Sequence, residues 1–146
     1  MPDKRSVELF IVDIFVAIQK IKHYTQMIEN ADDFLADHLR WDACIRNLEI
    51  IGEASNNLLK DEIFNSYSPK YFRQVVNFRN MISHAYFGIS HEEVWDVVTE
   101  KIDILETDLK KIALEKFVLD EAIEQEIPKQ TIIELKNYLI KLKRAN

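Results

Sequence analysis

Hydrophobic residues recur every three or four positions along most of the 146-residue chain, which is the spacing of amphipathic helices. The first helix is predicted from about Ser6 to Glu29. The second extends to Lys60 from the polar cluster at 30–33, which offers an N-cap. Their apolar positions include Leu9 or Phe10, Ile14, Ile18, Ile21 and Ile28 in the first helix, and Phe34, Leu35, Leu39, Trp41, Ile45, Leu48, Ile51, Ala54 and Leu58 in the second.

Turn-forming residues separate the later segments. Residues 65–68 are predicted to form a loop, and Pro69, with Ser68 as its cap, begins a third helix that should stop near Gly88. Ser90 and Glu93 have the spacing of a capping box and begin a helix to about Phe117. Its apolar stripe contains Val94, Val98, Ile102, Leu105, Leu109 and Ile112.

The last predicted helix opens at Pro128 and continues through Lys143, with an apolar stripe at Ile132, Leu135, Leu139 and Leu142. The whole chain has two Gly and three Pro, far below the average usage of about 7% and 5%. The expected fold is therefore all-α, an antiparallel bundle of four to five helices in a single domain over residues 1–146. Gly52 inside the second helix predicts close approach by another helix or by a partner chain.

Composition excludes several classes of protein. The lone Cys44 cannot form an internal disulfide and is expected to be a small buried hydrophobe, which favours a cytoplasmic location. The apolar stretch at 7–18 is interrupted by Glu8 and Asp13, so neither a signal peptide nor a membrane span is expected. The four histidines are scattered and there is no Gly-rich phosphate loop, so no metal or cofactor is expected.

Charge is distributed unevenly along this acidic chain. The formal net charge of −6 argues against a broad basic surface that coats nucleic acid. Between Glu62 and Glu92, however, there is no acidic residue, and the interval contains Lys70, Arg73, Arg79, His84 and His91. A second basic cluster at 136–144 is either a solvated helix end or a surface that helps hold RNA or a protein partner.

Residues 79–86 gather polar groups within this acid-free interval. On a helix, one arc carries Arg79, Asn80, Ser83, His84 and Tyr86, and the opposite arc carries Phe78, Met81, Ile82 and Ala85. Any one of these polar residues alone is more often structural, and an Arg near a helix end can bond the last carbonyls. Glu53 is either a buried partner for Arg79 or an ordinary exposed helix residue.

The pair Arg79 and His84 suits the cleavage of RNA without a metal. A guanidinium binds phosphate and stabilises the charge that develops on phosphorus. An imidazole transfers protons near neutral pH, and the 2′-hydroxyl of RNA supplies the nucleophile. One His per chain is a limitation, and a twofold dimer would resolve it by placing two such pairs in one cleft.

The residues Arg79-Asn80-x-x-x-His84-x-Tyr86 match the Arg-x4-His-x-Tyr signature of the HEPN superfamily. Together with Ile50-Ile51-Gly52-Glu53-Ala54 upstream, they resemble the HepT toxins, and the resemblance covers roughly residues 6–115. It implies a homodimeric helical RNase toxin paired with a nucleotidyltransferase antitoxin, MntA, that transfers AMP to the motif Tyr. Carried over by position, Arg79 and His84 are catalytic, Asn80 and Ser83 support them, and Tyr86 is modified.

Residues 118–146 depart from the shorter members of that family and are expected to be a C-terminal helical extension. Two other functions stay open. One is a non-catalytic partner or substrate-binding subunit of a nucleotidyltransferase, in keeping with the acidic total charge. The other is a structural dimer that seals the polar arc in its interface, although burying two Arg79 side chains without carboxylates would cost several kcal/mol.

Overall fold

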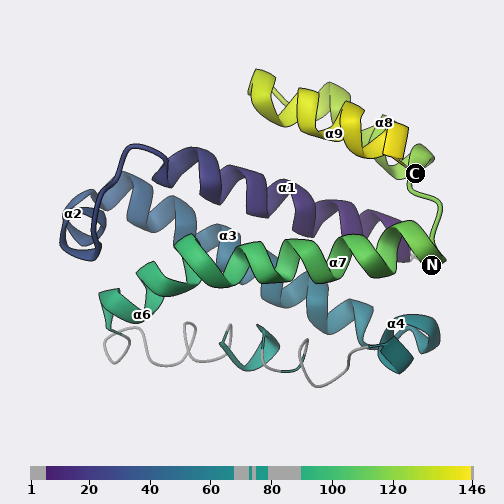
Figure 1. Ribbon diagram of the computed structural model, residues 1–146, viewed down its shortest axis with the longest axis horizontal. Coiled ribbons are helices and arrows are strands. Elements are labelled where there is room, and N and C mark those ends of the chain that lie inside the picture. Colours follow the sequence, from purple (N-terminus) through teal and green to yellow (C-terminus); the bar gives the residue numbers. More distant parts are fainter. Residues whose placement is uncertain (1–5, 68–72, 74, 79–89, 146) are drawn as a thin grey trace, which may run out of the picture.

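The computed structural model describes residues 6–67, 73, 75–78 and 90–145 (Figure 1). These residues form helices, and the described part of the chain contains no strand, so the all-α prediction is confirmed. The α-helices are α1 (Val7–Thr25), α2 (Ala31–Ala36), α3 (His38–Leu58), α4 (Glu62–Tyr67), α6 (His91–Asp96), α7 (Ile102–Lys116), α8 (Asp120–Glu126) and α9 (Ile133–Ala145). A π-helical turn, η1 (Val97–Lys101), joins α6 to α7, and a 3₁₀ turn, η2 (Ile127–Lys129), follows α8.

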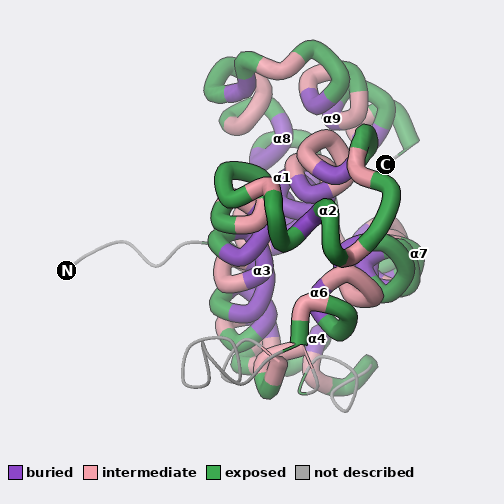
Figure 2. The backbone as a smooth tube through the Cα atoms, turned by 90° about the vertical axis from the view of Figure 1, so that its left-hand side faces the viewer, coloured by how far each residue is buried: buried purple, intermediate pink, exposed green. Residues whose placement is uncertain are grey.

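Helix α1 is the central element of the bundle. It packs along α3, and it also contacts α7, α8 and α9. Figure 1 shows α8 and α9 above α1. The described segment 75–78 lies at the opposite end of this view, below α3 and α7. Buried residues line the facing sides of these helices (Figure 2). None of the described helices is both long enough and apolar enough to cross a bilayer.

Helix α1 begins as predicted but ends early. The Ser6 hydroxyl accepts a hydrogen bond from the Leu9 backbone N–H at 3.3 Å and caps the helix. The helix ends at Thr25 instead of Glu29, because Ile28 N–H bonds back to the Thr25 carbonyl in a turn. That turn lets Asn30 cap the next helix through a 2.8 Å bond from Asp33 N–H to its side-chain oxygen, which confirms that the cluster at 30–33 supplies the cap.

The prediction of one continuous helix from 30–33 to Lys60 is wrong, since Asp37 divides it into α2 and α3. Asp37 leaves the helical region with ψ of 85° and accepts a hydrogen bond from Arg40 N–H at 3.2 Å. The break turns α2 so that the fully buried Phe34 ring lies 5.0 Å from Trp41 and 5.4 Å from Trp95. Gly52 is buried in α3, the helix along which α1 packs.

The loop predicted at 65–68 is also wrong where the structure describes it, because residues 65–67 belong to α4. The Asp61 carboxylate accepts a bond from Phe64 N–H at 3.0 Å, and the Phe64 side chain is fully buried. Residues 73 and 75–78 are helical, in agreement with the third predicted helix. Its predicted start at Ser68 and Pro69 and its stop near Gly88 lie outside the described residues.

The predicted cap at Ser90 is confirmed, because its hydroxyl accepts a bond from Glu93 N–H at 3.2 Å. The helix continues from α6 through η1 and α7 to Lys116, one residue short of the predicted end. All six residues of its predicted apolar stripe are buried. The π-helical turn within it was not expected, and it holds more residues per turn than an α-helix.

The C-terminal segment forms two helices that pack on the bundle. Pro128 lies in η2, and the predicted last helix begins only at Ile133, whereas α8 was not expected. One hydrophobic cluster contains residues of α1, α3 and α7 together with Leu119, Ala122, Ile123, Leu135, Leu139 and Leu142. The segment is therefore packed on the bundle through apolar contacts with α1.

A cluster of polar side chains, here called the Glu106 cluster, joins α7 to α1 and α9. The Glu106 side chain is 12% exposed and accepts hydrogen bonds from Gln19, Lys22 and Tyr138 at 2.7, 2.7 and 2.6 Å. Burial acts to raise the pKa of Glu106, but the bonds from Lys22 and Tyr138 outweigh it and hold that pKa below its usual value. Burial and the bond to Glu106 raise the pKa of the Tyr138 hydroxyl.

Cys44 is a buried free thiol in α3, as its sequence context predicted. Burial raises the pKa of this thiol to about 12. At neutral pH it is therefore protonated and unreactive, because the thiolate is the nucleophilic form of cysteine. Cys44 belongs to the core.

Candidate functional site

The predicted site residues Arg79, Asn80, Ser83, His84 and Tyr86 lie outside the described residues. The structure describes both flanks of this motif. Its N-terminal flank is the helical segment 75–78, and its C-terminal flank begins at Ser90. The surroundings of these two flanks define where the motif connects to the bundle.

The N-terminal flank forms one wall of a pocket of about 580 Å³ between α3 and the η1–α7 helix. Phe78, the residue directly before Arg79, is one of its lining residues. The lining is mainly apolar and comprises Leu48, Ile51, Val75, Asn77, Phe78, Val97, Lys101, Ile102, Ile104 and Leu105. The π-helical turn contributes Val97 and Lys101, and such turns are frequent at functional sites.

Polar groups are few around this pocket. Asn77 and Lys101 are its polar lining residues, and the Lys101 ammonium lies 3.6 Å from the Asp96 carboxylate. Arg73, from the acid-free interval of the sequence, is exposed. Glu53 is exposed as well, so the part of the hypothesis that made Glu53 a buried residue is wrong, whereas its pairing with Arg79 concerns a residue outside the described ones.

The C-terminal flank is fixed to α2. The Ser90 cap sets the first turn of α6, and Trp95 of that helix packs against the buried Phe34 ring of α2. At the same junction the His91 Nε2 atom lies 2.7 Å from an Asp32 carboxylate oxygen and 3.2 Å from a Glu92 oxygen. Residues 79–89 are therefore followed immediately by a helix with a defined position against α2.

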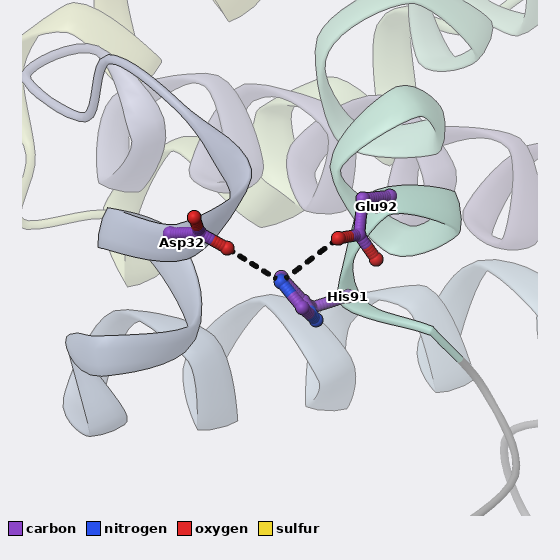
Figure 3. Close-up of side chains that lie close together, drawn as sticks. All are labelled: Asp32, His91 and Glu92. Atoms are coloured by element: carbon purple, nitrogen blue, oxygen red, sulfur yellow. Dashed lines mark hydrogen bonds and ion pairs between the residues drawn. The ribbon is translucent and has the colours of Figure 1, made fainter.

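The three residues Asp32, His91 and Glu92, here called the His91 cluster, come together only in the folded chain (Figure 3). Their ligand atoms all lie within 4.8 Å of one another. In the sequence, His91 belongs to the acid-free interval and Asp32 to the polar cluster at 30–33 predicted to supply a cap, and nothing connects these two residues, which are 59 positions apart. No spacing rule could have found this pair, because it depends on the packing of α2 against α6.

Comparison with known families accounts for most of the chain. The family described as Ribonuclease HepT-like matches residues 14–112. The chain belongs to this HepT-like ribonuclease family. The matched residues include the motif at 79–86, the flanking segment 75–78 and helix α6, and all the residues that line the pocket. The sequence-based prediction of a HepT-like ribonuclease is confirmed at this level.

Individual relatives lead to the same family. The chain is 38% identical over 110 residues to the "Probable ribonuclease HepT" of Thermococcus cleftensis, covering 75% of this chain and 97% of that protein. It is 37% identical over 109 residues to a "Putative RNase" of Methanocaldococcus jannaschii, covering 75% and 86% of the two chains. No solved structure matches the chain significantly.

The family match ends inside α7, at Ile112. Helices α8 and α9 therefore lie beyond the part of the chain that defines a HepT-like ribonuclease. They pack on α1, away from the segment 75–78 that leads into the motif (Figure 1). The basic end of α9 is thus remote from the described flank of the predicted site.

Proposed function

We propose that this HepT-like ribonuclease is a metal-independent endoribonuclease toxin, and that AMPylation of Tyr86 by a cognate nucleotidyltransferase antitoxin silences it. The observation that carries the proposal is the match of residues 14–112 to the family, because Arg79, His84 and Tyr86 stand inside the matched region. The relatives named as ribonucleases support the choice of RNA as substrate.

The proposed chemistry divides between two side chains. The Arg79 guanidinium binds the scissile phosphate and stabilises the negative charge that builds up on it. His84 moves the proton of the 2′-hydroxyl or of the leaving oxygen. In a homodimer with one shared cleft, two His84 side chains divide the acid and base roles, and Asn80 and Ser83 orient the phosphate.

The proposed regulation acts at the same place. AMP on Tyr86 adds a phosphodiester with one negative charge, two positions beyond His84 in the sequence. If this phosphodiester occupies the position of the substrate phosphate, it pairs with the Arg79 guanidinium and prevents RNA from binding there. The required partner is a nucleotidyltransferase that supplies the adenylyl group from ATP.

Cleavage of a single-stranded RNA by the purified full chain in the presence of EDTA tests the proposed activity. We expect cleavage by the wild-type protein and a loss of roughly 100-fold or more in Arg79→Ala and His84→Ala, since each removes an acid–base or charge-stabilising group. Arg73→Ala is the matched control, because Arg73 is an exposed arginine of the same acid-free interval. Full cleavage by both motif variants would refute the proposal.

Mass spectrometry after co-expression with the nucleotidyltransferase tests the regulation. We expect adenylyl groups on Tyr86, none on Tyr86→Phe, and loss of RNA cleavage by the modified protein. Modification of a chain that never cleaves RNA would favour the alternative, a substrate-binding or partner subunit of the nucleotidyltransferase. Sedimentation velocity of the unmodified chain tests the proposed homodimer, and a monomer that cleaves RNA at full rate would contradict the shared cleft.

A further inference from the structure

We propose that the His91 cluster is a binding site for a transition-metal ion of the zinc type, with Asp32, His91 and Glu92 as its three protein ligands. This site is separate from the proposed ribonuclease chemistry, which needs no metal. It joins α2 to α6 and so ties the start of α6 to the bundle.

The cluster offers the atoms that such an ion prefers. His91 presents Nε2, and Asp32 and Glu92 each present a carboxylate oxygen. Imidazole nitrogen suits Zn²⁺, Ni²⁺ and Cu²⁺, whereas Mg²⁺ and Ca²⁺ favour sites made of oxygen atoms alone. One nitrogen with two carboxylate oxygens is a ligand set of the type that Zn²⁺ binds, with its fourth position left for water.

The distances are close to those of a bound ion. Ligands about 2.0–2.2 Å from a tetrahedral ion lie about 3.4 Å from one another. In the structure, Nε2 lies 2.7 Å from the Asp32 oxygen and 3.2 Å from the Glu92 oxygen, and all three atoms fall within 4.8 Å. Side-chain shifts on the order of 1 Å would therefore admit the ion.

The hydrogen-bond arrangement favours a cation at this point. A ring nitrogen carries at most one hydrogen, so Nε2 cannot donate a full hydrogen bond to two carboxylates at once. Both oxygens nonetheless converge on this one atom in Figure 3. An ion that replaces the single Nε2 proton would satisfy all three groups, and it would offset the repulsion between Asp32 and Glu92.

The backbone of the site is set in advance by packing and capping. Asp32 follows the Asn30 cap of α2, and His91 and Glu92 follow the Ser90 cap of α6. The contact between Phe34 and Trp95 holds these two helices together beside the cluster. Ligands on elements that are already positioned lose little further conformational freedom when an ion binds.

The site is also open to an ion from solution. The His91 side chain is 25% exposed, whereas those of Asp32 and Glu92 are 88% and 67% exposed. The expected occupant is therefore an exchangeable ion.

Isothermal titration calorimetry of the untagged, chelator-treated full chain with ZnCl₂ tests the proposal, with MgCl₂ as the comparison ion. We expect one Zn²⁺ per chain, no measurable heat with Mg²⁺, and an affinity at least about tenfold weaker in His91→Gln and in Asp32→Asn. Two controls should keep wild-type affinity. They are His38→Gln, an exposed histidine elsewhere, and Glu93→Gln, the acidic neighbour of Glu92.

Thermal unfolding gives a second readout that does not depend on heats of binding. Zn²⁺ should raise the Tm of the wild type and of both controls, and it should leave the Tm of His91→Gln unchanged. Equal binding by wild type and His91→Gln, or no wild-type binding at millimolar Zn²⁺, would overturn the proposal. Either result leaves the ribonuclease proposal intact, because RNA cleavage is tested in EDTA.

Discussion

The Glu106 cluster and the His91 cluster both join helices that are far apart in sequence, but solvent reaches them very differently. Glu106 is 12% exposed and bonded from two other helices, whereas Asp32 is 88% exposed. A buried carboxylate with several partners is costly to disturb, because each partner left behind has lost its access to water. An exposed ion pair contributes little to stability, and its atoms stay available to a ligand.

Among the changes that test this comparison, removal of residues 118–146 should lower the stability of the fold the most. It takes away Tyr138 and the buried apolar residues that α8 and α9 add to the core. We expect the free energy of unfolding to fall by about 5 kcal/mol or more, since each buried Leu or Ile contributes roughly 1.5–3 kcal/mol. Urea denaturation measures the change, and a chain shortened only by residues 145–146 is the control. An unchanged midpoint would show that the bundle does not need these helices.

Glu106→Gln should lower the free energy of unfolding by about 1–3 kcal/mol at pH 7, because Lys22 loses a charged partner inside the cluster. The substitution keeps the size of the side chain and its ability to accept a bond from Tyr138. Glu124→Gln is the matched control, because the ion pair of Glu124 with Lys143 is exposed and should contribute less to the free energy of unfolding than the buried Glu106 does. Equal effects of the two substitutions would contradict the distinction drawn from burial.

The difference between wild type and Glu106→Gln should depend on pH. The pKa of Glu106 is held below its ordinary value of 4.5 in the folded chain, so its carboxylate stabilises the fold above that pH. As the pH falls through the folded pKa, the stabilisation disappears. Denaturation from pH 7 to pH 3 should show the two proteins differing fully at neutral pH and converging in acid. A constant difference across this range would argue against an ionised Glu106.

Tyr138→Phe should cost about 1 kcal/mol, which is the typical contribution of one hydrogen bond. The variant loses the bond to Glu106 but keeps the ring, which lies 6.3 Å from Phe15 and 5.2 Å below the Lys110 ammonium. Tyr67→Phe, at a tyrosine that is 40% exposed, should change the unfolding midpoint less. The reverse order of the two effects would show that the bond in the cluster contributes little.

His91→Gln in the presence of a chelator should have the smallest effect, below about 1 kcal/mol, because its partners are exposed. Urea denaturation of this variant beside Glu106→Gln compares the two clusters directly. A larger fall in the free energy of unfolding for His91→Gln than for Glu106→Gln would mean that the contact between α2 and α6 is a major source of stability without any ion.

Features that depend on a few neighbouring residues were predictable from the sequence. The caps at Asn30 and Ser90 are correct, because each requires only a short polar side chain before an apolar helical pattern. The apolar stripe from Val94 to Ile112 is buried as expected, since its spacing alone marks one side of a helix. The all-α class follows from the same patterns.

Helix boundaries were not predictable where a side-chain cap or a buried contact competes with the weak helix or loop preference of the same residues. Asp37 looked like one more polar position of a long helix, yet its side chain caps a new one. Residues 65–67 have loop-forming types, but the burial of Phe64 and the cap by Asp61 favour α4. In each case a tertiary contact or a local side-chain bond outweighs weak intrinsic preferences.

The same distinction between local and long-range features applies to the candidate site. The motif at 79–86, together with the segment 50–54 upstream, indicated the family to which the chain belongs, because residue types and their spacing can be seen directly in the sequence. The two polar clusters were missed, since Gln19 and Glu106 are 87 positions apart, and Asp32 and His91 are 59 apart. Periodicity identifies which side of a helix is buried, but it does not identify the helix that covers it.

The π-helical turn η1 gives the chain between the motif and α7 a place where its length can change. Such a turn accommodates about one residue more than an α-helical turn, so the helix on either side of it keeps the same face toward the core. Deleting one residue from 97–101 should therefore restore a regular helix and leave Leu105, Glu106 and Leu109 facing their present neighbours. The same deletion from a regular helix such as α1 or α3 would rotate everything beyond it by about 100°. In the evolution of this chain, loss of one residue should be tolerated better at 97–101 than within α1 or α3.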